Sequence, residues 1–144
     1  MEELGCRVLV VDDYELWRDF VCSLFRNRPG FQVVGEVSDG AEAVQKAQEL
    51  QPDLILLDIG LPTVNGIDAA QQICKVSSKS KILFVTQESS PEVVQEALNS
   101  GALGYILKTN ANRELFPAVE RVVRGGTSWS TRGEVSAVIA NLSI

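Results

Sequence analysis

The 144-residue sequence contains no histidine, and this absence excludes several kinds of catalytic site. Without histidine there is no Ser-His-Asp or Cys-His catalysis and no His-containing zinc site. No apolar run is long enough to span a bilayer, and the N-terminus lacks the layout of a signal peptide, so we expect no membrane contact. The net charge of −6 argues against direct binding to nucleic-acid phosphates by these residues.

Cysteine is scarce, with Cys6, Cys22 and Cys74 far apart in the sequence. Because their sequence neighbours are mostly apolar, we expect reduced core residues in a cytoplasmic protein. The remaining composition, 45% hydrophobic and 22% charged, is ordinary for a globular chain. A chain of this length has room for one domain with a substantial core.

The stretch from Pro52 to Pro62, PDLILLDIGLP, contains the clearest buried strand. An apolar run opened by Pro and closed by Gly and Pro is typical of a strand covered on both faces. Asp58 comes where this run ends. Since an unpaired charge is costly to bury, we expect Asp58 to emerge in a crevice at the carboxyl end of the strand. The alternative is an ordinary acidic residue that terminates the strand.

Four more β-rich runs alternate with helical patterns along the sequence. The predicted strands cover residues 6–11, 31–37, 81–86 and 104–107, besides the one before Asp58. The predicted helices cover residues 14–28, the segment from a cap at Ser38 or Asp39 to Leu50, the segment after Asn65-Gly66, the segment from Ser90-Pro91 to Ser100, and residues 113–124 after a cap at Asn110 or Asn112. Pro117 falls early in the last helix, so its start can lie later.

This alternation predicts an α/β fold. Strands and helices in turn favour a doubly wound parallel sheet with helices on both faces and right-handed crossovers. In such sheets the chemistry lies at the carboxyl ends of the strands.

Polar side chains at four of these strand ends suit phosphoryl chemistry. They are Asp12 and Asp13 after the first strand, Asp58 after the third, Thr86 at the end of the fourth and Lys108 after the fifth. Three converging carboxylates need a cation, and carboxylates without His or Cys ligands suit Mg²⁺. Lys108 supplies a compact positive charge and Thr86 a hydroxyl, which leaves Asp58 as the nucleophile for an acyl phosphate. The alternative is a set of unrelated strand ends with separate caps and salt bridges.

With these residues the sequence resembles the receiver domain of bacterial two-component response regulators, over about residues 6–126. The resemblance lies in VLVVDD, PDLILLDIGLP, FVT and GALGYILK, which contain the strand-end residues above. GALGYILK and DIGLPTVNGIDA are most similar to the NarL/FixJ branch, which carries a LuxR-type helix-turn-helix. The resemblance implies a flavodoxin-like (βα)5 fold with five parallel strands in the order 2-1-3-4-5.

The resemblance also implies roles for individual residues. Asp58 would accept a phosphoryl group from the phosphohistidine of a sensor histidine kinase. Asp13 and Asp58 would bind Mg²⁺ directly, Asp12 would help through water, and the backbone carbonyl of Gly60 would complete the protein ligands. Thr86 and Lys108 would contact the phosphoryl oxygens.

Two further roles come from the same resemblance. Tyr105 occupies the aromatic switch position, and a Thr86 drawn toward the phosphoryl group would bias the surface formed by the fourth helix, fifth strand and fifth helix. Gly60 and Glu88 stand at positions that influence how fast the phosphoryl group is lost.

The C-terminal residues 127–144 follow the predicted receiver domain, residues 1–126. TSWST reads as a linker, and Val135, Val138, Ile139 and Leu142 form one face of a short helix that cannot fold alone. We expect either a truncated transcription regulator whose DNA-binding domain would follow Ile144, or a stand-alone receiver that acts by protein–protein interaction. A homodimer is compatible with both.

Three other classes fit less well. A Mg²⁺-dependent phosphohydrolase with an aspartyl phosphate typically has a second Asp two residues after its nucleophile, where this sequence has Gly60. A dinucleotide-binding domain needs a glycine-rich loop after the first strand, where Asp12 and Asp13 stand instead. The intact acidic set argues against a pseudo-receiver. The sequence therefore predicts a signalling phosphoacceptor, not an enzyme.

Overall fold

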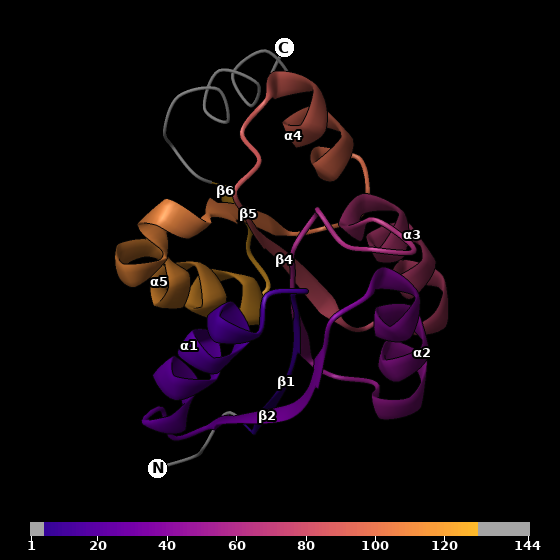
Figure 1. The fold of residues 1–144 in the computed structure, drawn as a ribbon. Helices are drawn as coiled ribbons and strands as arrows, with labels where there is room; N and C mark the ends of the chain where they lie inside the picture. Colours follow the sequence, from indigo (N-terminus) through magenta and orange to yellow (C-terminus); the bar gives the residue numbers. More distant parts are fainter. Residues whose placement is uncertain (1–4, 130–144) are drawn as a thin grey trace.

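Six parallel strands form one sheet in the computed structural model, which describes residues 5–129 (Figure 1). Their order is β2-β1-β3-β4-β5-β6. The bounds are β1 (Cys6–Val11), β2 (Phe31–Val37), β3 (Leu54–Leu57), β4 (Lys81–Thr86), β5 (Gly104–Leu107) and β6 (Ser128–Trp129). The predicted order 2-1-3-4-5 is confirmed, whereas the predicted number of strands was one too few for the part of the chain described.

Five α-helices cover the sheet in these residues. They are α1 (Glu15–Arg26), α2 (Gly40–Leu50), α3 (Gly66–Val76), α4 (Pro91–Leu98) and α5 (Ala111–Val123), and a 3-10 turn, Lys108–Asn110, precedes α5. Helices α1 and α5 pack on one face of the sheet, and α2, α3 and α4 pack on the other (Figure 1). The predicted doubly wound α/β architecture is confirmed.

The helix caps decide between the alternatives that the sequence left open. Asp39, and not Ser38, caps α2, because its side chain accepts a hydrogen bond from the Glu42 amide at 2.9 Å. Asn110 occupies the N-cap position of α5, but its side chain makes no capping hydrogen bond. Helix α5 begins at Ala111, earlier than predicted, and it contains Pro117. Pro117 has no N–H to donate, so that turn lacks one helical hydrogen bond.

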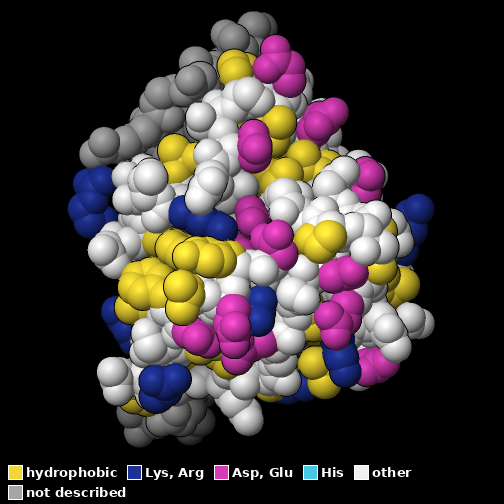
Figure 2. All heavy atoms as spheres, viewed as in Figure 1, with side chains coloured by type: hydrophobic (Ala, Val, Ile, Leu, Met, Phe, Trp, Pro, Cys, Tyr) yellow, Lys and Arg dark blue, Asp and Glu magenta, His cyan; other side chains and the backbone are white. Residues whose placement is uncertain are grey.

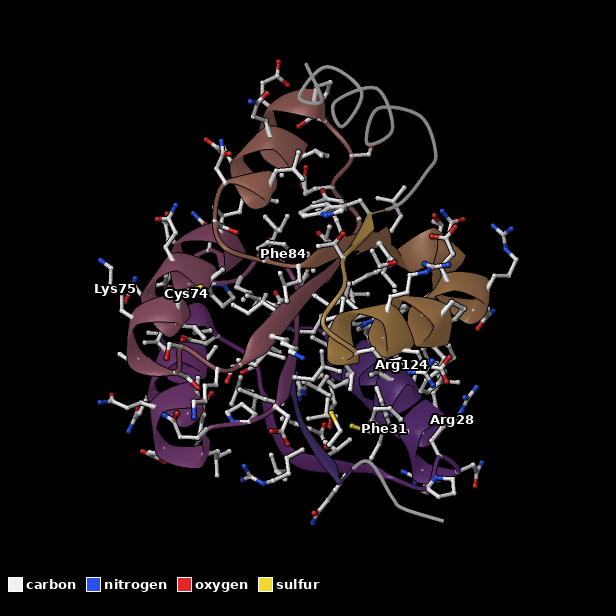
Figure 3. The ribbon with its side chains drawn as sticks, turned by 180° about the vertical axis from the view of Figure 1, so that it is seen from behind. Arg28, Phe31, Cys74, Lys75, Phe84 and Arg124 are labelled. Carbon is white, nitrogen blue, oxygen red and sulfur yellow. The ribbon has the colours of Figure 1, made fainter. Side chains whose placement is uncertain are left out.

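The core is divided by the sheet into two clusters that alternate along each strand. In β3, Ile55 and Leu57 pack with the α2–α4 layer, while Leu54 and Leu56 pack with α1 and α5. All four are buried, which explains the uninterrupted apolar run in the sequence. Phe84 continues the first cluster in β4, and it lies in the middle of the structure in Figure 3.

Aromatic rings join three elements on the α1–α5 side. The Phe25 ring centroid lies 5.4 Å from that of Phe31 in β2 and 5.0 Å from that of Phe116 in α5. Arg28 places its guanidinium carbon 3.8 Å from the Phe116 centroid (Figure 3 labels Arg28 and Phe31). These contacts fix α1 against α5.

Strand β6 was predicted as part of a linker. The Ser128 amide donates to the Leu103 carbonyl at 3.0 Å, and Arg121 Nη1 donates to the Ser128 hydroxyl at 3.0 Å. Gly104 permits the pairing, because a Cβ there would lie 2.7 Å from the Ser128 carbonyl oxygen. A two-residue strand has no periodicity that a sequence pattern could reveal.

The predicted helical face Val135–Leu142 lies outside the described residues. Among the helices that the structure describes, none combines the length and hydropathy needed to cross a membrane.

We predict that the three thiols react slowly in the folded protein. Burial raises the pKa of Cys6 and of Cys22 to about 11 and also raises the pKa of Cys74. The thiolate is the reactive form, so at pH 7.5 alkylation should be at least about tenfold slower than in urea, and it should accelerate as the pH rises toward these pKa values. Mass spectrometry of iodoacetamide adducts measures both rates, and equal rates in the two conditions would contradict the prediction.

Candidate functional site

The register of β1 and β3 places two of the predicted acids side by side. Val11 pairs with Leu57, so Asp12 and Asp58 leave the carboxyl edge of the sheet together. The Asp58 amide donates to the Val11 carbonyl at 3.1 Å, which extends the pairing by one residue. Asp58 is therefore fixed by backbone hydrogen bonding, as expected for a site at the strand ends of a parallel sheet.

The register of β4 and β5 places the other two predicted residues, Thr86 and Lys108, at the same edge of the sheet. Thr86 pairs with Leu107, and Lys108 follows directly. The side chain of Lys108 then crosses back over the sheet edge. Its Nζ lies 2.7 Å from Asp12 Oδ2 and 3.4 Å from Asp58 Oδ2. Side chains from β1, β3 and β5 thus meet at one point, as predicted.

Asp12, Asp13 and Asp58 each place a carboxylate oxygen within 4.8 Å of the others. Asp12 is 2% exposed and Asp58 8%, whereas Asp13 is exposed to solvent. Burial raises the pKa of Asp12 above its usual range, although the ammonium of Lys108 and a hydrogen bond from the Tyr14 amide oppose this. The cluster thus combines two buried carboxylates with one that faces solvent.

The acid cluster fits a magnesium ion. Its side-chain donors are all carboxylate oxygens, the ligands that Mg²⁺ prefers. All three oxygens lie within 4.8 Å of one another, near enough for one octahedral ion with bonds of about 2.1 Å to contact them after small side-chain rotations. In addition, Asp12 Oδ2 is buried and makes no hydrogen bond of good geometry despite its ion pair with Lys108. This buried oxygen already lies beside one positive charge, the Lys108 ammonium, so its position suits a cation.

A cavity of about 230 Å³ lies over the cluster. It is lined by Asp13, Tyr14, Asp58, Gly60, Thr86, Gln87, Glu88 and Lys108. Every predicted site residue except Asp12 and Tyr105 lines it, and Asp12 lies directly behind, paired with Lys108. Figure 2 shows the face of the molecule on which acidic side chains gather in the middle, beside a group of hydrophobic side chains.

Tyr105 does not reach this cavity, but it is connected to it through Glu88. The buried Tyr105 hydroxyl donates to the Glu88 carbonyl, and the Glu88 amide donates to Thr86 Oγ1 at 3.3 Å. Burial raises the pKa of Tyr105 above its usual value, so the hydroxyl remains protonated. The backbone of Glu88 thus hydrogen-bonds to both Thr86 and Tyr105, the two residues of the predicted switch.

The loop after Asp58 is shaped by close backbone packing. The Asp58 side chain accepts a hydrogen bond from the Ile59 amide at 2.8 Å, and the Gly66 amide donates to the Ile59 carbonyl at 2.7 Å. A Cβ on Gly66 would lie 2.0 Å from the carbonyl oxygen of Asp58. Gly66 is therefore required for the position of the Asp58 backbone, a role that the sequence analysis did not assign beyond a turn.

Trp17 is a further contact of the site that the sequence did not reveal. Its ring centroid lies 5.1 Å from Lys108 Nζ. In the sequence Trp17 belongs to the apolar stripe of α1, which is typical of a core residue. It also lines a cavity of about 610 Å³ that adjoins the acidic one and shares Tyr14, Gln87 and Lys108 with it.

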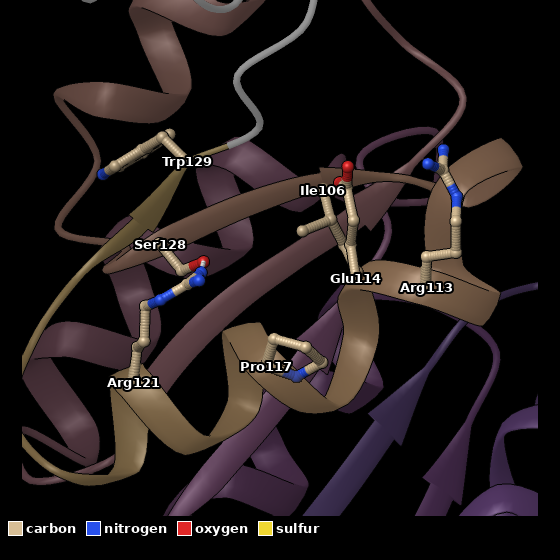
Figure 4. A pocket seen from close by; sticks show the side chains of 7 residues that line it. All are labelled: Ile106, Arg113, Glu114, Pro117, Arg121, Ser128 and Trp129. Atoms are coloured by element: carbon tan, nitrogen blue, oxygen red, sulfur yellow. Dashed lines mark hydrogen bonds between the residues drawn. The ribbon is translucent and has the colours of Figure 1, made fainter.

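Trp129 is the second missed contact. Its ring stacks on that of Tyr105 with centroids 6.1 Å apart and an interplanar angle of 20°. Trp129 also lines a separate cavity of about 250 Å³ between α5 and β6, with Arg113, Glu114 and Arg121 (Figure 4). The only signal in the sequence was one aromatic residue within a polar segment.

Comparison with known proteins identifies the family and the fold. Residues 8–120 match the family model of the response regulator receiver domain. The chain is 38% identical over 119 residues to the transcriptional regulatory protein LiaR of Bacillus subtilis and 39% identical to the response regulator protein VraR of Staphylococcus aureus. Each match covers 83% of this chain, with 56% of LiaR and 57% of VraR. The chain thus spans little more than half the length of these relatives.

Solved structures agree with these matches. A LuxR-family two-component response regulator from Aurantimonas sp. SI85-9A1 is 31% identical with a TM-score of 0.86, over 95% of this chain and 96% of that one. The receiver domain of the putative response regulator NarL from Mycobacterium tuberculosis is also 31% identical, with a TM-score of 0.79 over 87% and 99%.

The family match shows that this doubly wound sheet, with acids, a hydroxyl and an amine at its carboxyl edge, is a signal-receiving domain. The chain belongs to the response regulator receiver family, and its relatives place it in the NarL/FixJ branch.

We predict that Gly66→Ala destabilises the protein, whereas Gly60→Ala does not. Helix propensity alone would make alanine about 1 kcal/mol more favourable than glycine at this position. A decrease in the free energy of unfolding would therefore report the clash with the Asp58 carbonyl, and we expect a decrease of about 1–3 kcal/mol. Nothing lies within 4 Å of a Cβ on Gly60, so that change should stay within about 0.5 kcal/mol. Urea unfolding gives both values. An unchanged midpoint for Gly66→Ala would contradict the close approach.

Proposed function

We propose that Asp58 is the phosphoacceptor and that a sensor histidine kinase is the donor. The supporting observation is the position of the Asp58 carboxylate, which lies at the carboxyl end of β3, beside Asp12 and Asp13, with Lys108 Nζ 3.4 Å away. In the transfer, an Asp58 oxygen forms a bond to phosphorus as the bond from phosphorus to the kinase histidine nitrogen breaks. The electron pair stays on that nitrogen, which then takes up a proton.

We propose that Asp12, Asp13, Asp58 and the backbone carbonyl of Gly60 hold Mg²⁺. The ion would supply positive charge that offsets the carboxylates and the transferred phosphoryl oxygens. Gly60 lines the acidic cavity and is exposed, which supports a role for its backbone in the site. Its lack of a side chain also leaves no acid at the position where a phosphohydrolase would protonate its leaving group.

Lys108 and Thr86 would bind the phosphoryl oxygens. Lys108 already lies among the acids, and phosphorylation would add a charge of about −1.5 to −2 on Asp58 that attracts it. Thr86 Oγ1 accepts a hydrogen bond from the Glu88 amide, so its own O–H is free to donate to a phosphoryl oxygen.

We propose that the switch passes through the segment at Glu88. A Thr86 drawn toward the phosphoryl group would move the Glu88 peptide, whose carbonyl accepts the Tyr105 hydroxyl. Tyr105 lies in β5 and stacks on Trp129 of β6, so the change would reach the α4–β5–α5 surface and the segment that follows it.

The output would be regulation of transcription through a LuxR-type DNA-binding domain, with homodimerisation after phosphorylation. The similarity to the transcriptional regulatory protein LiaR and to a LuxR-family response regulator supports this proposal. A stand-alone receiver that acts by protein–protein contacts is the second candidate. The free, protonated cysteines suit the cytoplasm, where we place the protein.

We predict that Asp58→Asn abolishes labelling by acetyl phosphate in the presence of Mg²⁺, because the amide cannot act as the nucleophile. The matched control is Asp53→Asn, which changes the acid directly before β3 instead of the one directly after it. Asp53 Oδ2 accepts a hydrogen bond from the Arg7 amide at 2.8 Å, and asparagine can keep that bond. Phosphate-affinity electrophoresis should show a phosphorylated band for Asp53→Asn and none for Asp58→Asn. Undiminished labelling of Asp58→Asn would refute the assignment.

We predict that Glu88→Ala changes the lifetime of the phosphorylated protein severalfold. The exposed Glu88 side chain lines the acidic cavity, where it is positioned to orient or hinder the attacking water. The Glu88 backbone contacts to Thr86 and Tyr105 would survive this substitution. The decay of the phosphorylated band gives the lifetime, and an unchanged decay would end this hypothesis.

A further inference from the structure

The ring of Trp17 lies beside the ammonium of Lys108, which two acids also contact. Lys108 is 10% exposed, and the nearest carboxylate oxygens, from Asp12 and Asp58, lie 2.7 and 3.4 Å from its Nζ. The Trp17 ring centroid lies 5.1 Å from the same Nζ, within the range of a cation–π interaction. The ammonium is therefore enclosed by two carboxylates and one aromatic face.

Trp17 is itself held in place. It lies in the first turn of α1, where its amide donates to the Tyr14 carbonyl at 3.1 Å. Its ring packs beside Phe20 with centroids 5.2 Å apart, and it is half-buried against the α1–α5 cluster. A ring fixed in this way can hold the mobile end of the long Lys108 side chain.

We propose that Trp17 is a positioning residue for Lys108. The lysine side chain has a flexible stem of four carbons, and its ammonium is strongly hydrated when it has no protein partner. The indole face excludes water from one side of the ammonium and attracts it electrostatically. This keeps Lys108 beside Asp58, where the phosphoryl group arrives.

A cation–π contact constrains the direction of the ammonium less than a hydrogen bond does. Lys108 can therefore turn from Asp12 toward a phosphoryl group on Asp58 while it stays over the ring. The role of Trp17 rests on the proposed function of Asp58, but the contact itself can be tested without phosphorylation.

The kinetic test compares Trp17→Leu with Trp17→Phe. Leucine keeps an apolar contact without a π face, whereas phenylalanine keeps a π face. We expect Trp17→Leu to be labelled by acetyl phosphate and Mg²⁺ about three- to tenfold more slowly, within the range of cation–π energies, and Trp17→Phe to recover most of the rate. Leu16→Ala, at the neighbouring residue that is 65% exposed, is the control on the same helix and should label normally.

A double-mutant cycle separates positioning from a structural role. If Trp17 acts through Lys108, Trp17→Leu should change the labelling rate by less than about 1.5-fold in a Lys108→Met background. An equal loss in both backgrounds, or a normal rate for Trp17→Leu alone, would overturn the proposal. Urea unfolding of each variant shows whether it is folded.

Fluorescence tests the contact independently of phosphorylation. The chain has two tryptophans, so Trp129→Phe leaves Trp17 as the only indole and retains a ring to stack on Tyr105. In the Trp129→Phe variant, Lys108→Met should change the fluorescence intensity of Trp17 by at least about a tenth, because an adjacent ammonium perturbs the excited indole. Unchanged emission would overturn the contact. If the wild-type protein were not labelled at all, the proposed role of Asp58 as phosphoacceptor would be refuted. The fluorescence measurement would still test the contact between Trp17 and Lys108.

Discussion

The site depends on one constraint, which is that three carboxylates lie within 4.8 Å of one another at the edge of a buried sheet. Like charges this close repel strongly where water is largely excluded, so a positive charge must lie among them. Lys108 provides that charge from the residue directly after β5, 50 residues away from Asp58 in sequence. The rest of the domain keeps these charges together: the parallel strands end at one edge, and the buried layers on both sides prevent the ends from separating.

This constraint also explains how the domain could act as a switch. The positive charge of Lys108 is shared between Asp12 and Asp58, so a phosphoryl group on Asp58 would change the balance of the whole cluster. The Thr86–Glu88–Tyr105 connection leads away from the site through one peptide segment, and Trp129 extends it to β6. A small movement at the site thus has a packed route to a distant surface, although only a two-state element would make that route a switch.

Much of the fold could be predicted because its signals are local. The run before Asp58 predicted a strand buried on both faces, and Ser90 and Asn65 predicted helix starts that the structure confirms. Strand β6 escaped prediction because its two residues are stabilised by a neighbouring strand and not by a pattern of their own. The early start of α5 was missed for a similar reason. The 3-10 turn Lys108–Asn110 leads directly into the helix, and Pro117 was taken as a sign of a later start.

The sequence by itself determined the alternation of strands and helices and the identity of the polar residues at the strand ends, because periodicity and residue type are local properties. Only the tertiary structure decided which atoms meet. It placed Lys108 between two acids, set the Trp17 ring against its ammonium and left Gly66 no room for a side chain beside Asp58. These contacts join residues from different elements, and their distances follow from sheet register and side-chain packing, which no single segment of the sequence contains.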